Sequence, residues 1–262
     1  MSAFAVIIDR HVAGSSLVHS LDPRVKLLAT LAFIFSVLFI PQARWELFGA
    51  YACLLALATL AASLSPKLVI GRSLLALPFV MAAVPVLFNR PGESLFSVPV
   101  FGWTATDVGL EALSSILLRS WLSVTAATIL TAATEPDHIL RSLRTFGVPR
   151  VLVATISFMW RYIFVIGEEA QRLLRAREAR AARPAGKAGG SLGWRARVAG
   201  NMVGSLFLRS LARSERVYVA MLARGYNGEL RSLDRFHVRP ADLIFVAVTL
   251  GSIATLQLYA RL

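Results

Sequence analysis

The chain has 262 residues, of which 56% are hydrophobic and only 16% are charged, and its formal net charge is +13. Soluble globular domains carry about 25% charged residues, so this composition excludes a soluble protein that covers its surface with polar side chains. The charge is concentrated, because residues 161–240 hold 16 of the 28 Lys and Arg residues and 6 of the 15 acidic residues. The chain is therefore expected to be an integral membrane protein with a basic portion outside the bilayer.

Five long stretches with little or no charge mark the expected membrane spans, because a helix needs about 20 mostly apolar residues to cross a bilayer. Asp22 as N-cap and Pro23 as first helical residue predict the helix start before the first span. Four spans lie in the N-terminal part, residues 1–134, and Pro78 and Pro85 predict kinks in the third. The spans cover residues 27–43, 47–66, 73–89, 112–134 (which includes Arg119) and 243–260.

A further apolar stretch, residues 151–167, decides the topology. Lys67 and Arg72 flank the turn after the second span, so the positive-inside rule places this turn and the N-terminus in the cytoplasm. If residues 151–167 crossed the bilayer, the basic segment 161–240 would be translocated; if they do not, 24 of the 28 Lys and Arg residues lie inside. The sequence therefore predicts about five transmembrane helices in the bacterial cytoplasmic (inner) membrane, with the C-terminus outside.

The segment between the fourth and fifth spans, residues 135–241, is expected to form a cytoplasmic unit of two long helices and a short one. Pro149 can open the first long helix, about residues 149–182, and Pro184 would end it. The second long helix covers about residues 194–225. The expected fold class is an all-α integral membrane protein in which this unit is inserted before the last span.

The second long helix has a basic side and a side that can pack against neighbours. The basic side suits either a solvated surface beside anionic lipids or a surface that faces a partner, and the sequence leaves both interpretations open. Ala196, Gly200 and Gly204 recur every four residues, a spacing that lets two helices cross closely. We therefore expect the two long helices to cross at these three residues.

Both long helices end in an alanine followed by an arginine, at Arg180 and at Arg224. An arginine at a helix C-terminus interacts favourably with the helix macrodipole, by about 0.3–1 kcal/mol, so a purely local role is one interpretation. The other is a pair of cationic tips that dock into two equivalent clefts of a dimeric partner. Gly225 would let the chain leave the second helix in a left-handed conformation.

Two arginines interrupt apolar stretches, Arg119 and Arg161, and such residues are functional candidates in membrane proteins. For Arg119, an internal structural partner is favoured over a role in transport. The sequence has no GxxxxGK[ST] phosphate loop, no HExxH or CxxC metal motif, and a single cysteine, Cys53. We therefore predict no catalytic, cofactor-binding or metal-binding residue and no enzymatic activity, so any ATP-driven function needs a partner.

A series of short strings in chain order carries a resemblance to one protein family. The series comprises His19-Ser20-Leu21-Asp22-Pro23-Arg24-Val25-Lys26-Leu27, Thr106-Asp107-Val108-Gly109-Leu110, Arg119, Phe146-Gly147-Val148-Pro149, Arg161-Tyr162, Glu168-Glu169 and Ala223-Arg224-Gly225. In order and spacing, over roughly residues 15–230, they resemble the transmembrane (T) subunits of energy-coupling factor (ECF) transporters. The subgroup they resemble most is the cobalt-uptake CbiQ type.

The resemblance implies a membrane scaffold with two cytoplasmic coupling helices, whose tips insert into grooves of two ABC-type ATPases. The second tip matches the family's Ala-Arg-Gly motif in full, whereas the first has Ala181 where the family usually has Gly or Ser. Arg177 is therefore the alternative for the first tip. The ATPase-coupling residues that the resemblance implies are Ala179, Arg180, Ala223, Arg224 and Gly225.

The resemblance further implies that the chain is the non-catalytic coupling subunit of an ATP-driven importer. CbiO-like ATPases would hydrolyse ATP, and the chain would relay their motion to a CbiM-like substrate-binding membrane subunit, with or without a small accessory membrane subunit. Cobalt, for cobalamin biosynthesis, is the expected cargo, with nickel, biotin or another vitamin as alternatives. An independent secondary carrier is a remote alternative because the chain shows no inverted repeat, and the dispersed aromatics of the basic segment disfavour nucleic-acid binding.

Overall fold

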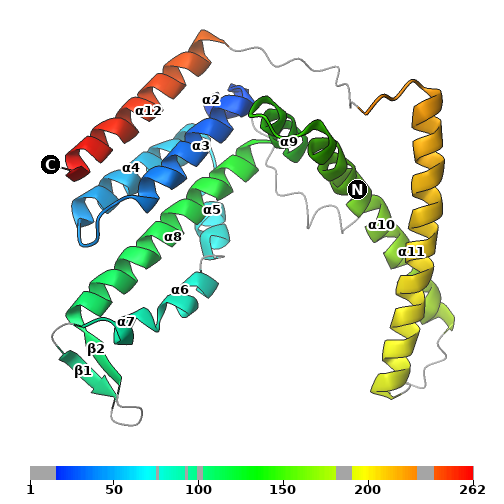
Figure 1. The fold of residues 1–262 in the computed structure, drawn as a ribbon, viewed down its shortest axis with the longest axis horizontal. Coiled ribbons are helices and arrows are strands. Elements are labelled where there is room, and N and C mark those ends of the chain that lie inside the picture. Colours follow the sequence, from blue (N-terminus) through cyan, green and yellow to red (C-terminus); the bar gives the residue numbers. More distant parts are fainter. Residues whose placement is uncertain are drawn as a thin grey trace. The chain divides into compact units, whose positions relative to one another are not determined.

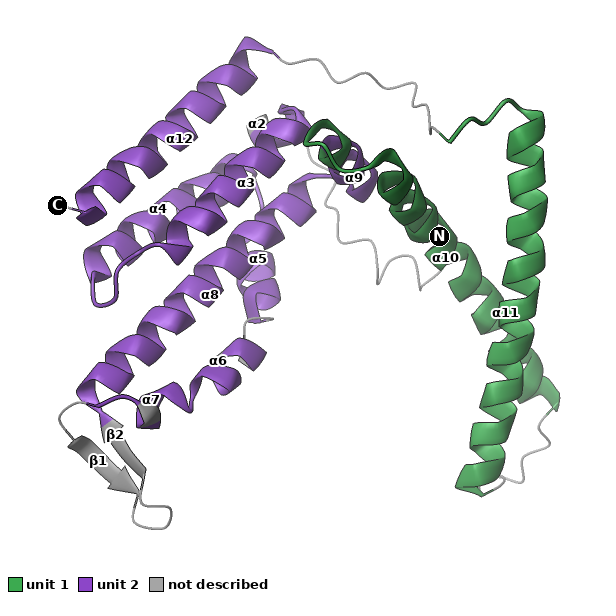
Figure 2. Cartoon of the chain, viewed as in Figure 1, with its two compact units in different colours: residues 1–10, 143–234 green, residues 11–142, 235–262 purple. Residues whose placement is uncertain are grey.

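The computed structural model describes residues 16–74, 77–91, 94–98, 103–180, 191–228 and 239–261, and most of them are helical (Figure 1). The chain divides into two compact units (Figure 2). One, here called the helical bundle, contains the described residues up to 142 together with 239–261. The other, here called the two-helix unit, contains the described residues from 143 to 228. Each unit is considered by itself below.

The bundle is built from α2 (Leu17–Ser20), α3 (Pro23–Leu38), α4 (Trp45–Ala61), α8 (Asp107–Ala133) and α12 (Pro240–Arg261). The predicted start of α3 is confirmed, because the Asp22 side chain accepts a hydrogen bond from the backbone N–H of Arg24 (2.9 Å) and Pro23 is the first helical residue. One apolar core joins α3, α4, α8 and α12. Its most deeply buried large residues include Val37, Leu47, Tyr51 and Leu122.

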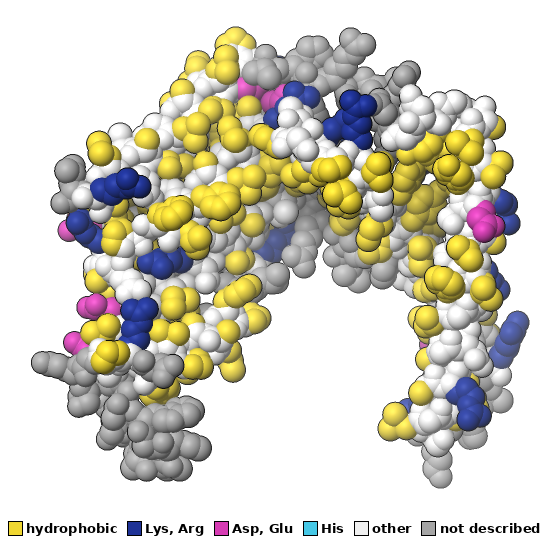
Figure 3. Space-filling view, viewed as in Figure 1, with side chains coloured by type: hydrophobic (Ala, Val, Ile, Leu, Met, Phe, Trp, Pro, Cys, Tyr) yellow, Lys and Arg dark blue, Asp and Glu magenta, His cyan; other side chains and the backbone are white. Residues whose placement is uncertain are grey.

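The outer surface of the bundle is apolar as well. Large side chains such as Phe35 and Phe39 are exposed, at 60% and 72% of their surface, and apolar side chains cover much of the visible face of the bundle (Figure 3). A bundle with an apolar core and an apolar exterior suits a hydrocarbon solvent rather than water. The bundle thus has the surface of a membrane protein.

The expected third span, residues 73–89, is not one kinked helix, so the prediction of a single helix is wrong, whereas a crossing of the membrane by this region stays a prediction. The region contains α5 (Pro66–Ser73), α6 (Leu77–Ala83) and α7 (Val86–Asn89). Pro85 lies in the turn before α7 and has no N–H to continue the ladder of helix hydrogen bonds, so α6 and α7 are separate. Pro78 is instead accommodated in the first turn of α6, where a proline is tolerated.

A two-stranded antiparallel sheet interrupts the otherwise helical bundle, and the all-α expectation did not include it. It consists of β1 (Ser94–Val98) and β2 (Trp103–Thr106), with Val98 opposite Trp103 and an irregularity between Ser94 and Phe96. Both segments are rich in β-branched and aromatic residues, which favour strands. The sheet ends where α8 begins.

The segment after α8 folds into the short helix α9 (Pro136–Thr145) and the long helices α10 (Arg150–Arg180) and α11 (Leu192–Ala223). α9 ends at Thr145, and Gly147, with a φ of 88°, follows two residues later. The N–H of Val148 donates to the carbonyl oxygen of Leu143 (3.3 Å). Pro149 then opens α10. Phe146-Gly147-Val148-Pro149 is therefore a helix stop followed directly by a helix start.

By length and composition, α8, α10 and α12 could each cross a membrane, and α4 is apolar but has 17 residues. Among these helices, α10 belongs to the segment that is predicted, from the charge distribution, to lie in the cytoplasm. The number of spans, predicted as about five, therefore stays a prediction. The fold and its apolar surface establish that the chain is a helical membrane protein.

Candidate functional site: two arginine-tipped helices

The tip of α11 has the geometry that its sequence predicts. Arg224 is the C-cap and is exposed, and Gly225 follows with a φ of 81°. The N–H of Gly225 donates to the carbonyl oxygen of Leu222 (2.9 Å), and the N–H of Tyr226 donates to that of Met221 (3.0 Å). These two bonds form a Schellman motif, which satisfies the last carbonyls of the helix from the backbone alone. The guanidinium of Arg224 is therefore not needed to cap the helix.

The tip of α10 ends at Arg180, and both Arg180 and Ala179 are exposed. Arg177, the alternative for this tip, is half-buried. Ala181, where the sequence departs from the family motif, and Pro184 lie outside the described residues. In the two-helix unit, α10 and α11 run in roughly opposite vertical directions (Figure 1), so their tips form two separate cationic ends.

A charged pair, rather than the small residues, connects the two long helices. Nη1 of Arg209 on α11 lies 2.7 Å from Oε1 of Glu169 on α10. A Cβ added at Gly200 or Gly204 would meet no atom within 4 Å beyond the helix itself. The expected crossing at Ala196, Gly200 and Gly204 is therefore wrong. Small residues at this spacing let helices cross closely in lipid, but the described contact between these two helices includes the exposed Arg209 and the half-buried Glu169 instead.

The two arginines within apolar stretches lie in different surroundings. Arg119 on α8 donates from Nη2 to the carbonyl oxygen of Ile40 (2.6 Å), just beyond the end of α3. It thus satisfies a carbonyl that no longer has a partner within a helix, next to the negative end of the helix dipole. Arg161 on α10 is exposed. The contact of Arg119 is a structural one within the bundle.

Two buried polar clusters join α3 to α12, and neither was predicted from the sequence. At one end, the Asp242 carboxylate accepts a hydrogen bond from the N–H of Asp22 (2.9 Å), and the nearby Lys26 ammonium donates to the carbonyl oxygen of Ala133 (3.3 Å). At the other end, Gln257 donates from Nε2 to the carbonyl and hydroxyl oxygens of Ser36 (2.7 and 2.8 Å), and the Ser36 hydroxyl also contacts that of Tyr51. The charged or amide side chains of Asp242 and Gln257, in an otherwise apolar helix, could have indicated buried polar contacts. The sequence does not indicate their partners, which are 220 and 221 residues away.

A model of the cobalt transport protein family, CbiQ, matches residues 14–234, well over half of the chain. The chain belongs to this family. It is thus a T component of the ECF transporters, a non-catalytic, multi-pass membrane subunit with a coupling role. The matched region contains both arginine tips and ends before α12.

Individual relatives agree with this assignment along nearly the whole T component. The chain is 31% identical to a protein of Thermotoga maritima over 270 residues and to one of Bacillus selenitireducens over 259 residues. Both are named energy-coupling factor transporter transmembrane protein EcfT, and the matches cover 98% and 94% of this chain and 94% of each relative. An uncharacterised protein of Methanocaldococcus jannaschii is 29% identical over 184 residues, 68% of this chain and 61% of that protein.

Proposed function

We propose that this T component relays ATP-driven motion of two CbiO-like ATPases to a separate substrate-binding membrane subunit, and that its cargo is cobalt. The observation that supports the relay is the pair of exposed Ala-Arg helix ends, at Arg180 and Arg224. At Arg224 the backbone already satisfies the helix end, so the guanidinium remains available for an acidic or carbonyl-lined groove of a partner. Two separate tips suit two copies of one ATPase.

We further propose five spans with the N-terminus in the cytoplasm, and the contacts inside the bundle bear on one part of this topology, the number of crossings between α8 and α12. Lys26 contacts Ala133, where the chain leaves α8, and Asp22 contacts Asp242, where it enters α12. Both ends of the intervening segment therefore lie at the same end of the bundle, so that segment crosses the membrane an even number of times. If α10 alone crossed the membrane, the number of crossings in this segment would be odd. If no helix of the segment crosses, the number is zero and the condition is met. The C-terminus then lies outside.

The assignment of cobalt rests on the name of the matching family, whose model is that of a cobalt transport protein. A CbiM-like subunit would recognise the metal, with or without a small accessory membrane subunit, and the T component would supply no metal ligand. Nickel, biotin or another vitamin would change that partner and leave the coupling role intact. The EcfT relatives carry no cargo in their names.

The relay is tested by reversing the charge of both tips, Arg180→Glu with Arg224→Glu. The matched control is Arg175→Glu with Arg216→Glu, which makes the same change in net charge at exposed positions of the same two helices. Tagged protein is purified from native membranes in detergent, and the eluate is assayed for ATPase chains and ATP hydrolysis. The tip variant should lose both, and the control should keep both.

Recovery of the ATPases with the tip variant would exclude the assigned role of the tips. The same purification of the unaltered chain identifies the cargo subunit by mass spectrometry. Uptake of radioactive cobalt, nickel and biotin by cells expressing the complex then separates the cargo alternatives. A purified chain that moves a solute alone in liposomes would instead establish an independent carrier.

A further inference from the structure

Lys26 is buried in the first turn of α3, with 5% of its surface exposed. Its ammonium donates to the carbonyl oxygen of His19 (3.1 Å) and to that of Ala133 (3.3 Å). Ala133 is the last residue of α8, so Lys26 holds the point at which the chain leaves the bundle. A buried ammonium requires compensating negative charge nearby.

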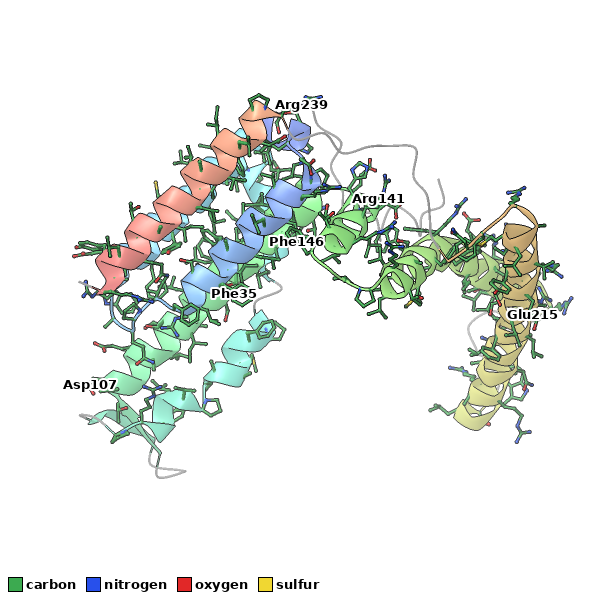
Figure 4. All side chains as sticks on the ribbon, turned by 45° about the horizontal axis from the view of Figure 1, so that its top comes forward. Phe35, Asp107, Arg141, Phe146, Glu215 and Arg239 are labelled. Carbon is green, nitrogen blue, oxygen red and sulfur yellow. The ribbon has the colours of Figure 1, made fainter. Side chains whose placement is uncertain are left out.

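Two aspartates offset part of the cost of burying that charge. Asp22 lies one turn before Lys26 and Asp242 lies in the first turn of α12. Burial lowers the pKa of Lys26 to about 8, and the negative charges of Asp22 and Asp242 act in the opposite direction. Asp242 is 1% exposed and accepts hydrogen bonds from the N–H of Asp22 (2.9 Å) and the N–H of Arg239 (2.7 Å). Arg239 lies at the start of α12 (Figure 4), so Asp242 holds the point at which the chain re-enters the bundle.

The cluster of Asp22, Lys26 and Asp242 thus fastens both ends of the segment 134–239, which carries both arginine tips. We propose that this cluster is the joint through which movement of that segment reaches α3, α8 and α12. The proposal rests on the proposed function, because it takes the ATPases as the source of the movement. Asp22, Lys26 and Asp242 would act as positioning residues: they would keep α3, the end of α8 and the start of α12 in fixed positions relative to one another.

The physical basis is the cost of moving a buried charge away from its hydrogen-bond partners. Moving the Lys26 ammonium away from the carbonyl oxygens of His19 and Ala133 would leave a buried charge without its hydrogen bonds, which is far less favourable than losing a neutral hydrogen bond. The cluster therefore resists stretching, and a displacement of the chain at Ala133 or Arg239 carries α3 with it. Without the charges, the same displacement could be absorbed locally.

The second polar cluster provides a matched control. Ser36, Tyr51 and Gln257 also join α3 to α12, and they are also buried or half-buried, but they are neutral and touch neither Ala133 nor Arg239. Removing the Ser36 hydroxyl leaves Gln257 and Tyr51 within hydrogen-bond distance of each other (3.3 Å). Ser36→Ala therefore weakens the α3–α12 contact without touching the joint.

The experiment uses the only cysteine of the chain as a reporter. Cys53 on α4 is exposed and lies in a shallow hollow whose other side is formed by Ser252, Thr255 and Leu256 of α12. The purified chain is labelled there with an environment-sensitive maleimide, combined with its ATPase and substrate-binding subunits, and mixed with ATP. ATP hydrolysis and the change in fluorescence are recorded on the same sample, so no knowledge of the cargo is needed.

The unaltered complex should give an ATP-dependent change in fluorescence. Lys26→Met and Asp242→Asn should reduce this change by about tenfold at a similar rate of hydrolysis, the order expected for losing one charged hydrogen bond. Ser36→Ala should keep it. A change that persists in both joint variants, or its absence from the unaltered complex, would overturn the proposal.

Failure of the joint and failure of the proposed function give different results. If no ATPase binds the unaltered chain, the proposed function fails before any reporter is read. If the ATPases bind and hydrolyse ATP in every variant and fluorescence responds equally, only the joint fails. If both joint variants fail to assemble while Ser36→Ala assembles, the cluster is needed for folding alone and the proposal is likewise overturned.

Discussion

The two long helices α8 and α11 have similar lengths, 27 and 32 residues, but opposite surroundings. α8 buries ten of its residues, most of them small, and contacts α3, α4, α5 and α7. None of the residues of α11, all of which the structure describes, is buried, and the helix contacts α10. Among the described residues, α8 therefore packs inside the bundle, whereas the surface of α11 is exposed or half-buried.

This difference explains why glycine has different roles in the two helices. Gly109, in the first turn of α8, is buried against α7, and a Cβ there would clash with the carbonyl oxygen of Leu87. Its N–H is also bonded to the hydroxyl of Thr106 (3.1 Å), the N-cap of α8. Gly200 in α11 has open space on the side of a Cβ. Only the first glycine is required by packing.

The largest expected effect contrasts these two glycines. Gly109→Ala should destabilise the bundle by about 1–3 kcal/mol, because α7 or α8 must shift to relieve the clash. Gly200→Ala should instead stabilise α11 by about 0.5–1 kcal/mol, because alanine loses less backbone entropy in a helix. Thermal unfolding in detergent measures the first effect, and hydrogen exchange of α11 amides in the full chain measures the second. Equal effects of the two substitutions would contradict the comparison.

The next effect concerns the tip of α11. Gly225→Ala places a side chain at a φ of 81°, which costs an L residue about 1–2 kcal/mol. Amide exchange at Tyr226 should become faster, because its hydrogen bond to Met221 is weakened. Recovery of partner ATPases should fall, because the backbone no longer fixes the direction of the Arg224 side chain. Gly193→Ala, in the first turn of the same helix, is the control and should change neither. Unchanged exchange at Tyr226 would show that the Schellman motif does not fix the tip.

Helix ends could be predicted from the sequence because their signals are local. Asp22 with Pro23 marks a start, and Gly225 marks an end, and each acts through hydrogen bonds within a few residues. The arginine tips followed from those ends and from the family resemblance. The helix ends and the arginine tips can both be predicted without knowing which helices pack together.

Contacts between helices could not be predicted in the same way. The Ala196, Gly200 and Gly204 pattern permits close crossing but does not say what crosses it, and here the contact is made by Arg209 instead. Asp242 and Gln257 were each visible as polar residues in or beside the last span. Their partners on α3 depend on which helices become neighbours, which local signals do not encode.

A smaller effect tests whether the bundle depends on its neutral polar cluster. Gln257→Leu removes the donor to both oxygens of Ser36 and leaves the Ser36 and Tyr51 hydroxyls in contact with each other. The expected loss of stability is about 0.6 kcal/mol, the mean for hydrogen bonds between membrane helices. Thermal unfolding of the full chain in detergent measures it, and Gln42→Leu, which removes one exposed hydrogen bond from Arg90 (3.2 Å), serves as the comparison and should cost less. A loss as large as that from Gly109→Ala would show that this cluster dominates helix association.

The smallest expected effect lies in the two-helix unit. Arg209 and Glu169 are 58% and 19% exposed, and Arg172 also approaches Glu169 (3.6 Å). An ion pair in such surroundings has a coupling energy of about 0.2–1 kcal/mol, and added salt screens it. A double-mutant cycle with Arg209→Ala and Glu169→Ala, read from hydrogen exchange of α11 in the full chain, should give this value at low salt and less at high salt. A coupling of zero at low salt would show that this pair does not contribute to the contact between α10 and α11.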